Sequence, residues 1–279
     1  MPTFTTPGPL SIQVEIAAGA VRVEASDRTD TVVEVLPSDP HRAVDVRDAE
    51  QTRVEHTDGT LVVRAPQRFS LFGKGSSVDV VLRVPAGSTL RATAALGPLT
   101  ATGRLGETTL KTGMGELRCE QVGAARLTTG MGDVTVDRAT GPASVVTGSG
   151  AVRLGTVDGT AVVKSSDGST WLGSVAGDVH VRAANGDVTV DEAGGGVDAR
   201  SANGDVRVLA ASRGALTLKT AVGGIDVGIR GGTAAWLDVS SSYGTVRTAL
   251  DAVDDPGPAD STVEVHARTG YGDITIHRT

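Results

Sequence analysis

Acidic residues that directly follow a glycine are the first feature of this sequence that could carry chemistry. They recur at steps of about eighteen residues or multiples of it, at Glu116, Asp133, Asp187 and Asp205. Aspartates stacked at the corners of nonapeptide repeats bind Ca²⁺ in β-helical proteins. The stretch "ANGDVTVDE" lacks the doubled glycine of that repeat, and Ala151 and Ser169 interrupt the column. We therefore predict that these acids are solvated at turn corners and that Ca²⁺ is not a ligand.

Catalytic arrangements are weak in this sequence. The five histidines are scattered without ligand spacing. Ser149 in "TGSGA" is not followed by a helical pattern, and "GMGELR" lacks the strand–helix context of a nucleotide site. Hydrolases built on β-helices use clustered carboxylates, for which Asp133, Asp137 and Asp191 are the candidates. We expect no catalytic residues, no cofactor and no enzyme, with a polysaccharide-acting enzyme as the less favoured alternative.

Glycines recur at a regular spacing, and this spacing defines the strands and corners that must position all these residues. One series runs at steps of seventeen or eighteen, and a second series lies halfway between its members, so the repeat unit is about nine residues. Nine residues suit one short strand and one tight corner, and such a repeat takes precedence over local motifs. The first series is Gly97, Gly115, Gly132, Gly150, Gly168, Gly186 and Gly204, and the second is Gly106, Gly123, Gly141, Gly159, Gly177, Gly195 and Gly214.

Alternation within each unit indicates strands rather than a helix. Val188 and Val190 flank Thr189, and Val206 and Val208 flank Arg207, so apolar side chains point inward and polar ones outward. The sequence therefore predicts an all-β protein: a parallel β-solenoid of a single chain, with two short strands per turn of about 18 residues. Like residues then stack on like residues about 4.8 Å apart, and the low aromatic content of 3% suits its thin interior.

Three regions follow from where this regularity holds. Residues 1–95 contain longer strands, which we expect to form an irregular N-terminal β cap continuous with the solenoid. Residues 96–250 carry the regular repeat. Residues 251–279 comprise an acidic loop, "DAVDDPGPADS", and a last strand from Tyr271, "YGDITIHRT", which we expect to close the other end.

Charge and composition exclude several classes of protein. The net charge is −7, and nucleic-acid surfaces normally carry a basic excess, so we expect no nucleic-acid partner. The lone cysteine, Cys119, excludes an internal disulfide and a cysteine metal cluster. No window approaches the roughly 20 apolar residues of a membrane span. The first residues show neither a basic segment nor the apolar run of a signal peptide, so we expect a cytoplasmic protein.

One column of outward side chains could bind an acidic partner. It is formed by the same outward position on one strand of each turn, and many of its residues are Lys or Arg. The alternative is that these cations are simply solvated at the surface. The column is Lys111, Thr128, Val146, Lys164, Arg182, Arg200 and Lys219.

Aromatic residues supply the other candidate contacts. Trp171 lies at an outward position between Arg153 and Thr189, where it could anchor a ligand or be covered by another segment. The insertion "PQRFSLFGKGSS" holds Phe69, Phe72 and Lys74, which suits either a partner surface or a plug for the solenoid end. Tyr243 and Tyr271 occupy equivalent corners, where we expect them to stack.

The stretch "VDVVLRVPAGSTLRATAALGPLTATG" (residues 78–103), followed by serial "TGxGD" and "NGDV" corners, resembles the bacterial putative-adhesin family of β-strand-repeat proteins, a domain of unknown function. Similar folds occur in toast-rack-like domains. The resemblance covers most of the chain and implies a β-solenoid with a binding or scaffold role, and it carries over no catalytic residue. We therefore predict a non-enzymatic interaction or scaffold protein with a protein partner or self-association. The alternative is an adhesin module for carbohydrate or a cell surface.

Overall fold

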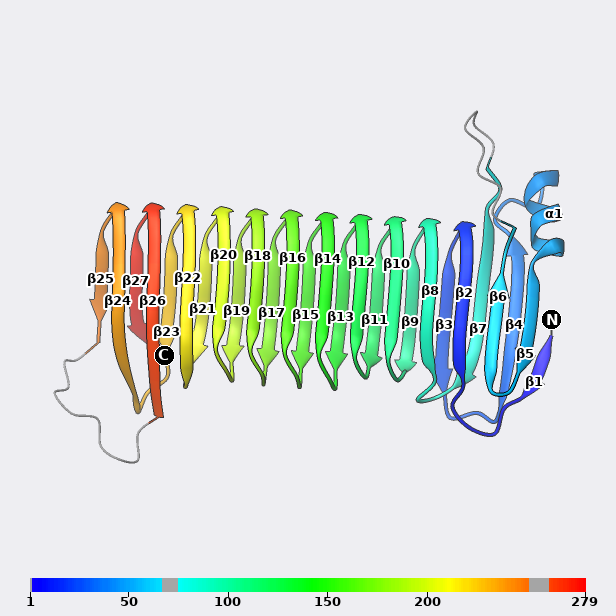
Figure 1. The fold of residues 1–279 in the computed structure, drawn as a ribbon, viewed down its shortest axis with the longest axis horizontal. Helices are drawn as coiled ribbons and strands as arrows, with labels where there is room; N and C mark the ends of the chain where they lie inside the picture. The colour runs from blue at the N-terminus through cyan, green and yellow to red at the C-terminus, as the bar shows by residue number, and fades with distance from the viewer. Residues whose placement is uncertain (1, 67–74, 251–260) are drawn as a thin grey trace. The chain divides into compact units, whose positions relative to one another are not determined.

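The computed structural model describes residues 2–66, 75–250 and 261–279 of the chain. The described residues are almost entirely strands, and they divide into two compact units, Met1–Arg138 and Ala139–Thr279. In each unit, two sheets face each other, and successive strands alternate between the sheets through tight corners (Figure 1). This arrangement is a flattened, largely parallel β-solenoid and confirms the predicted fold class.

The first unit begins with irregular strands and continues with regular turns. One sheet runs in the order β1-β4-β7-β3-β9-β11-β13 and the other in the order β12-β10-β8-β2-β6-β5. Its strands are β1 (Thr3–Thr5), β2 (Ser11–Ala18), β3 (Val21–Ser26), β4 (Asp30–Pro37), β5 (Arg53–Thr57), β6 (Thr60–Arg64), β7 (Val78–Pro85), β8 (Thr89–Leu96), β9 (Leu99–Arg104), β10 (Thr108–Met114), β11 (Leu117–Val122), β12 (Ala125–Met131) and β13 (Val134–Ala139).

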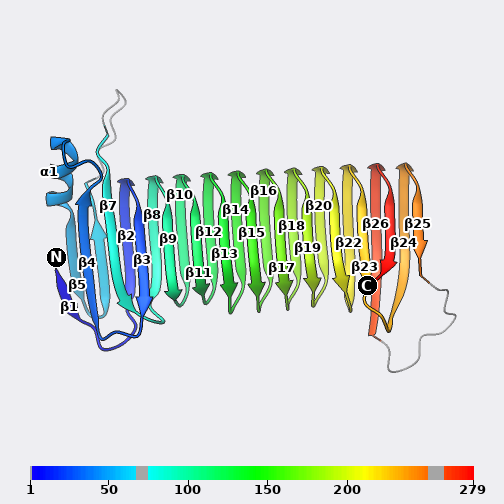
Figure 2. The same cartoon turned by 180° about the vertical axis from the view of Figure 1, so that it is seen from behind.

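Antiparallel strands and a helix cover the first end of this unit. β1 pairs with β4, β4 with β7 and β5 with β6, all antiparallel. Helix α1 (Ala43–Gln51) packs on β4 and β7 (Figure 2). Phe4 of one edge strand contacts His56 of the other at a ring-centroid distance of 5.2 Å. The sequence predicted only strands here, because "AVDVRDAEQ" has few apolar residues and no capping side chain. Arg42 and the amide of Ser77 bind the buried carboxylate of Asp45 on its inner face.

The second unit repeats the two-strand turn with close register. One sheet runs in the order β15-β17-β19-β21-β23-β27-β25 and the other in the order β24-β26-β22-β20-β18-β16-β14. Its strands are β14 (Ala143–Ser149), β15 (Val152–Val157), β16 (Ala161–Asp167), β17 (Thr170–Val175), β18 (Val179–Asn185), β19 (Val188–Ala193), β20 (Val197–Asn203), β21 (Val206–Ala211), β22 (Gly214–Val222), β23 (Ile225–Ile229), β24 (Thr233–Tyr243), β25 (Val246–Ala249), β26 (Ser261–Tyr271) and β27 (Ile274–Arg278).

The order of the last two turns differs from the order of the sequence. β26 lies between β22 and β24, and β27 lies between β23 and β25. The outermost turn is therefore β24–β25, as Figure 1 shows. The prediction that the strand after Tyr271 closes this end was wrong. The chain passes outward to form β24–β25 and then returns to insert its final turn, which sequence spacing alone does not reveal.

Glycine is required at the corners because the stacked corners touch through their backbones. Gly186 has φ +127° and Gly204 has φ +140°, in the region that disfavours side chains. A Cβ atom on Gly204 would lie 2.3 Å from the carbonyl oxygen of Gly186, and one on Gly186 would lie equally close to that of Gly168. The repeat therefore places a glycine in each such turn so that the turns can approach one another.

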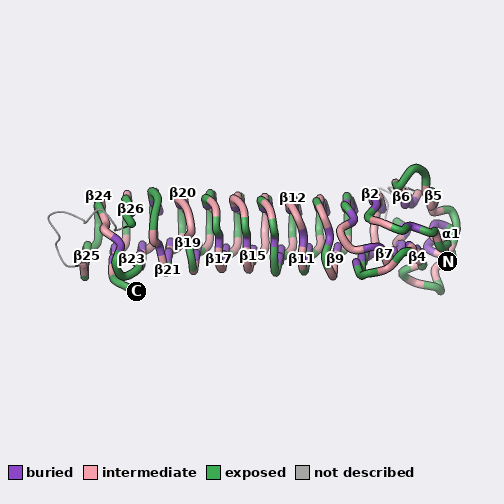
Figure 3. The backbone as a smooth tube through the Cα atoms, turned by 90° about the horizontal axis from the view of Figure 1, so that it is seen from below, coloured by how far each residue is buried: buried purple, intermediate pink, exposed green. Residues whose placement is uncertain are grey.

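Small hydroxyl residues close the interior beside these corners. Thr220 donates to the Gly204 carbonyl at 2.9 Å, and Ser201 donates to that of Gly186 at 3.2 Å. Between the two sheets lie the valines and leucines of the alternating pattern; Val188 pairs in register with Val206, and both are fully buried. Buried residues alternate with less buried ones along the strands, and Figure 3 shows exposed residues at the corners.

Candidate interaction surfaces

The repeated "NGD" corners of the second unit form a hydrogen-bonded ladder. Asn203 Nδ2 donates to Asn185 Oδ1 at 2.8 Å, and Asn185 Nδ2 donates to Asp167 Oδ1 at 2.8 Å. All three side chains are exposed and stand directly above one another. These hydrogen bonds therefore join the corners of successive turns.

The aspartates of the same corners also bind the neighbouring turn. Asp187 Oδ1 accepts the backbone N–H of Asp205 at 2.9 Å, and Asp205 Oδ1 accepts that of Gly224 at 2.8 Å. Arg207 donates to the second oxygen of both carboxylates. Among the described residues, no group of three or more His, Cys, Asp or Glu side chains has the arrangement of a metal site.

The predicted cationic column stands in register on the second unit. Lys164 pairs with Arg182, Arg182 with Arg200, and Arg200 with Lys219. Lys219 pairs in turn with Arg268 of β26, a member that sequence reasoning missed because β26 is far from β22 in sequence. We call Lys164, Arg182, Arg200, Lys219 and Arg268 the cationic column.

Asp198, two residues before Arg200 on the same face of β20, neutralises part of the cationic column. Asp198 accepts from Arg182 at 2.6 Å and from Arg200 at 3.1 Å. Burial tends to raise the pKa of Asp198, but the hydrogen bonds and charges of Arg182 and Arg200 outweigh it and hold the pKa below its ordinary value. Lys164 and Lys219 form no ion pair with any residue that the structure describes, so the two lysines keep their charge available to a partner.

Trp171 lies on the outer face of β17 and is half-buried. Its register partners are Arg153 and Thr189, as the alternation predicts. The Arg153 guanidinium lies 5.2 Å from the ring centroid, and Trp171 Nε1 donates to Asp191 at 3.2 Å. The indole also extends over Gly173, where a Cβ atom would lie 3.1 Å from its edge. Among the described residues, the contacts that hold the indole against the sheet come from neighbouring side chains.

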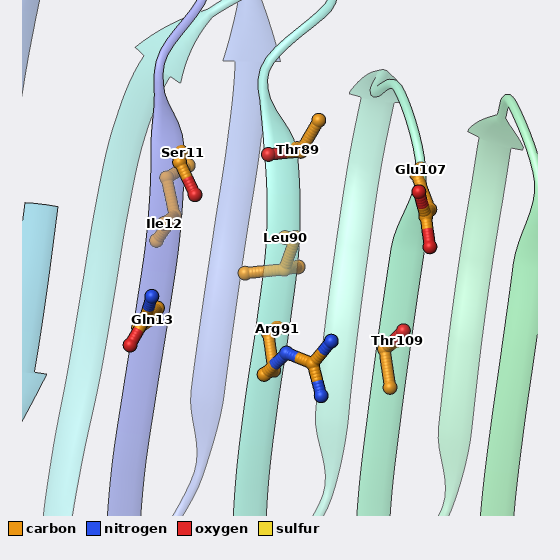
Figure 4. A pocket seen from close by; sticks show the side chains of 8 residues that line it. All are labelled: Ser11, Ile12, Gln13, Thr89, Leu90, Arg91, Glu107 and Thr109. Carbon is orange, nitrogen blue, oxygen red and sulfur yellow. The ribbon is translucent and has the colours of Figure 1, made fainter. Parts of the chain in front are cut away.

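A shallow hollow lies on the outer face of β2, β8 and β10 in the first unit. Its volume is about 140 Å³. Figure 4 shows Gln13, Arg91 and Thr109 on three neighbouring strands, with Glu107 just before β10. Arg91 and Glu107 both line the hollow, and neither forms an ion pair with another described residue. Sequence reasoning missed this site because its residues are ordinary outward residues of separate turns.

The remaining predicted contacts divide between described and undescribed residues. Phe69, Phe72 and Lys74 lie outside the described residues. Tyr243 and Tyr271 stack as predicted, with ring centroids 4.7 Å apart and an interplanar angle of 7°. None of the helices in the described part of the chain has the length and apolar character needed to cross a membrane.

The stacked two-strand turns and glycine corners define the chain as a β-solenoid repeat protein. The family described as Toastrack DUF4097 matches residues 10–279, and the chain belongs to this family. No curated protein matches the sequence.

Solved structures give distant similarities. A "putative cell adhesion protein" from Clostridium sporogenes is 10% identical, with a TM-score of 0.24 over 100% of this chain and 98% of its own. A "putative lipid binding protein" from Parabacteroides distasonis is 10% identical, with a TM-score of 0.37 over 100% and 95%. A "putative adhesin" from Parabacteroides merdae is 12% identical, with a TM-score of 0.37 over 100% and 95%.

Proposed function

We propose that this protein is a non-enzymatic interaction scaffold that binds an acidic polypeptide surface along the cationic column. The observation that supports the proposal is the in-register stack of five cations over successive turns. Strand spacing places neighbouring members about 4.8 Å apart. Such a rigid row matches an extended acidic segment better than an isolated surface lysine does.

The balance of charge favours an acidic partner over a purely solvated edge. The whole chain is acidic, with a net charge of −7, yet cations concentrate in this column. Asp198 holds Arg182 and Arg200 in fixed positions, while Lys164 and Lys219 remain without a carboxylate partner in the described structure. Electrostatic complementarity of this kind gives a fast, salt-dependent association.

Binding of fluorescently labelled poly-L-glutamate to the full chain tests the proposal. The double variant Lys164→Glu/Lys219→Glu should weaken binding by about tenfold or more at low ionic strength, because like charges now meet the probe. The matched control is Arg118→Glu/Arg126→Glu, which changes the net charge equally at two exposed positions of the first unit. Equal weakening by the two pairs would show a nonspecific charge effect, and lack of binding by the unmodified chain would refute an acidic polypeptide partner.

The hollow in the first unit supports a second candidate function, binding of carbohydrate or a cell-surface glycan. Hydroxyl groups of Ser11, Thr89 and Thr109 surround it with Gln13 and Arg91, and sugars are bound through such hydrogen-bonding groups. A glycan array with the unmodified chain and the Arg91→Ala variant tests this function. Loss of a defined glycan signal in Arg91→Ala supports it, and an array without signal rejects it.

A further inference from the structure

Among the described residues, no strand or helix covers the core beyond the outermost turn of the second unit. Within the described residues, β24 pairs with β26 and β25 pairs with β27, and neither has a neighbour on its other side. Val263 and Val265 of β26 are fully buried. Their partners Ala235 and Leu237 on β24 are only half-buried, and Val246 on β25 is 40% exposed.

The charges of this terminal turn are already neutralised by the turn beneath it. Asp238 binds Arg268 and His266, and Arg247 binds Asp273. Trp236 and Tyr243 remain 58% and 67% exposed. Aromatic side chains around an apolar centre with few free charges are typical of protein interfaces.

The first end of the other unit is built differently. Its inward residues Val33, Leu61 and Val63 are fully buried. A three-residue edge strand, antiparallel pairs and α1 cover them. Short edges and a covering helix are common devices against edge-to-edge association. At the terminal turn of the second unit, β25 is also short, with four residues, but β24 has eleven, and no helix among the described residues covers it.

We propose that the terminal turn β24–β25 binds the same turn of a second copy of this chain, forming a two-fold symmetric dimer. A covering partner must offer a strand edge to β24 and an apolar row beside it, and the same end of another copy offers both. This dimer uses a surface separate from the cationic column contact and does not depend on it.

The sequence of β24 permits pairing with itself. Antiparallel pairing centred on Leu237 places Trp236 opposite Asp238 of the second copy and keeps inward residues beside inward residues. No like charges then stand opposite each other. Because the contact joins identical surfaces, it closes at two copies and does not propagate.

Sedimentation velocity of the full chain over a range of concentrations tests this dimer. Leu237→Lys should raise the dissociation constant by about tenfold or more, because it places an unpaired ammonium at the centre of the contact. The matched control is Val146→Lys, since Val146 is 40% exposed and lies on the outer face of β14. A monomer at every concentration, equal effects of the two variants, or a series of higher oligomers would each overturn the proposal.

Distance measurement between spin labels gives a second test that does not rely on a disruptive variant. A label at Ser240→Cys should give an intermolecular distance on the order of 20 Å, because six strand residues separate the two sites in the pairing centred on Leu237. Cys119 is buried and should remain unlabelled. A label at Glu55→Cys, on the edge strand β5 of the first unit, should give no such distance. A short distance between Glu55 labels with none between Ser240 labels would place the contact at β5 and overturn the proposal.

Discussion

At the scale of single residues, the corner glycines determine whether turns can stack. Gly204→Ala places a methyl group 2.3 Å from the Gly186 carbonyl oxygen and also strains a backbone with φ +140°. We expect a loss of more than about 2 kcal/mol in the free energy of unfolding, because steric overlap adds to the conformational strain. Urea unfolding followed by circular dichroism measures the difference.

Gly231 provides the matched control for this substitution. A Cβ atom at Gly231 would meet nothing within 4 Å, and its backbone is not in the left-handed region. Gly231→Ala should change stability by less than about 0.5 kcal/mol. If Gly204→Ala lowered the free energy of unfolding as little as Gly231→Ala does, backbone contact between corners would not explain the regular spacing of the glycines.

The buried cysteine gives a second expectation at this scale. Burial, with a smaller contribution from the charge of Asp137, raises the pKa of the Cys119 thiol to about 12. The reactive thiolate is therefore scarce at neutral pH. A chromogenic disulfide reagent should modify Cys119 only when the protein unfolds, so the reaction should become rapid at the urea concentration of the unfolding transition. Rapid modification of the folded protein would contradict this burial.

At the scale of elements, Asp198 links two strands of the cationic column. Its folded-state pKa is lowered, so the stabilisation exists above the ordinary carboxyl pKa of about 3.9 and is lost as pH falls through the folded value. Asp198→Asn should reduce stability at pH 7 by under about 1 kcal/mol, since the pairs are exposed. The gap to the unmodified protein should begin to narrow below about pH 4 and close once pH falls below the lowered folded-state pKa.

The same variant separates stability from binding. Asp198→Asn releases Arg182 and Arg200 from their ion pairs, so poly-L-glutamate should bind more tightly although the fold is slightly less stable. Thermal unfolding at pH 7 and pH 3.5, together with the binding measurement, checks both effects. Weaker binding would mean that Asp198 orients the two arginines for the partner.

Strands could be predicted from the sequence because each turn depends on local alternation and on glycine spacing. Val188 and Val206 were placed in the core, and Lys164, Arg182 and Arg200 in one column, by counting alone. Helix α1 could not be found this way, because its stability comes from contacts made by buried carboxylates such as Asp45. The hollow at Arg91 was missed because it depends on side-chain shape across three strands.

At the scale of the whole molecule, a long connection can change the order of turns without changing their pattern. The register of β26 with both β22 and β24 shows that a turn far away in sequence fits between two others. Equivalent turns are therefore interchangeable in shape, because each offers the same inward rows and glycine corner. Stability in such a protein depends mainly on contacts between nearest neighbours.

Removal of one complete turn tests this interchangeability. Deleting residues 187–204 joins Gly186 to Asp205 and restores an "ANGD" corner, so Val206 can take the place of Val188 in the stack. We expect a folded, cooperatively unfolding protein whose circular dichroism per residue is unchanged. Deleting only residues 188–196 removes half a turn and requires every later strand of the second unit to change sheets. That variant should fold poorly, and equal behaviour of the two deletions would show that the sheets, and not the turns, are the interchangeable elements.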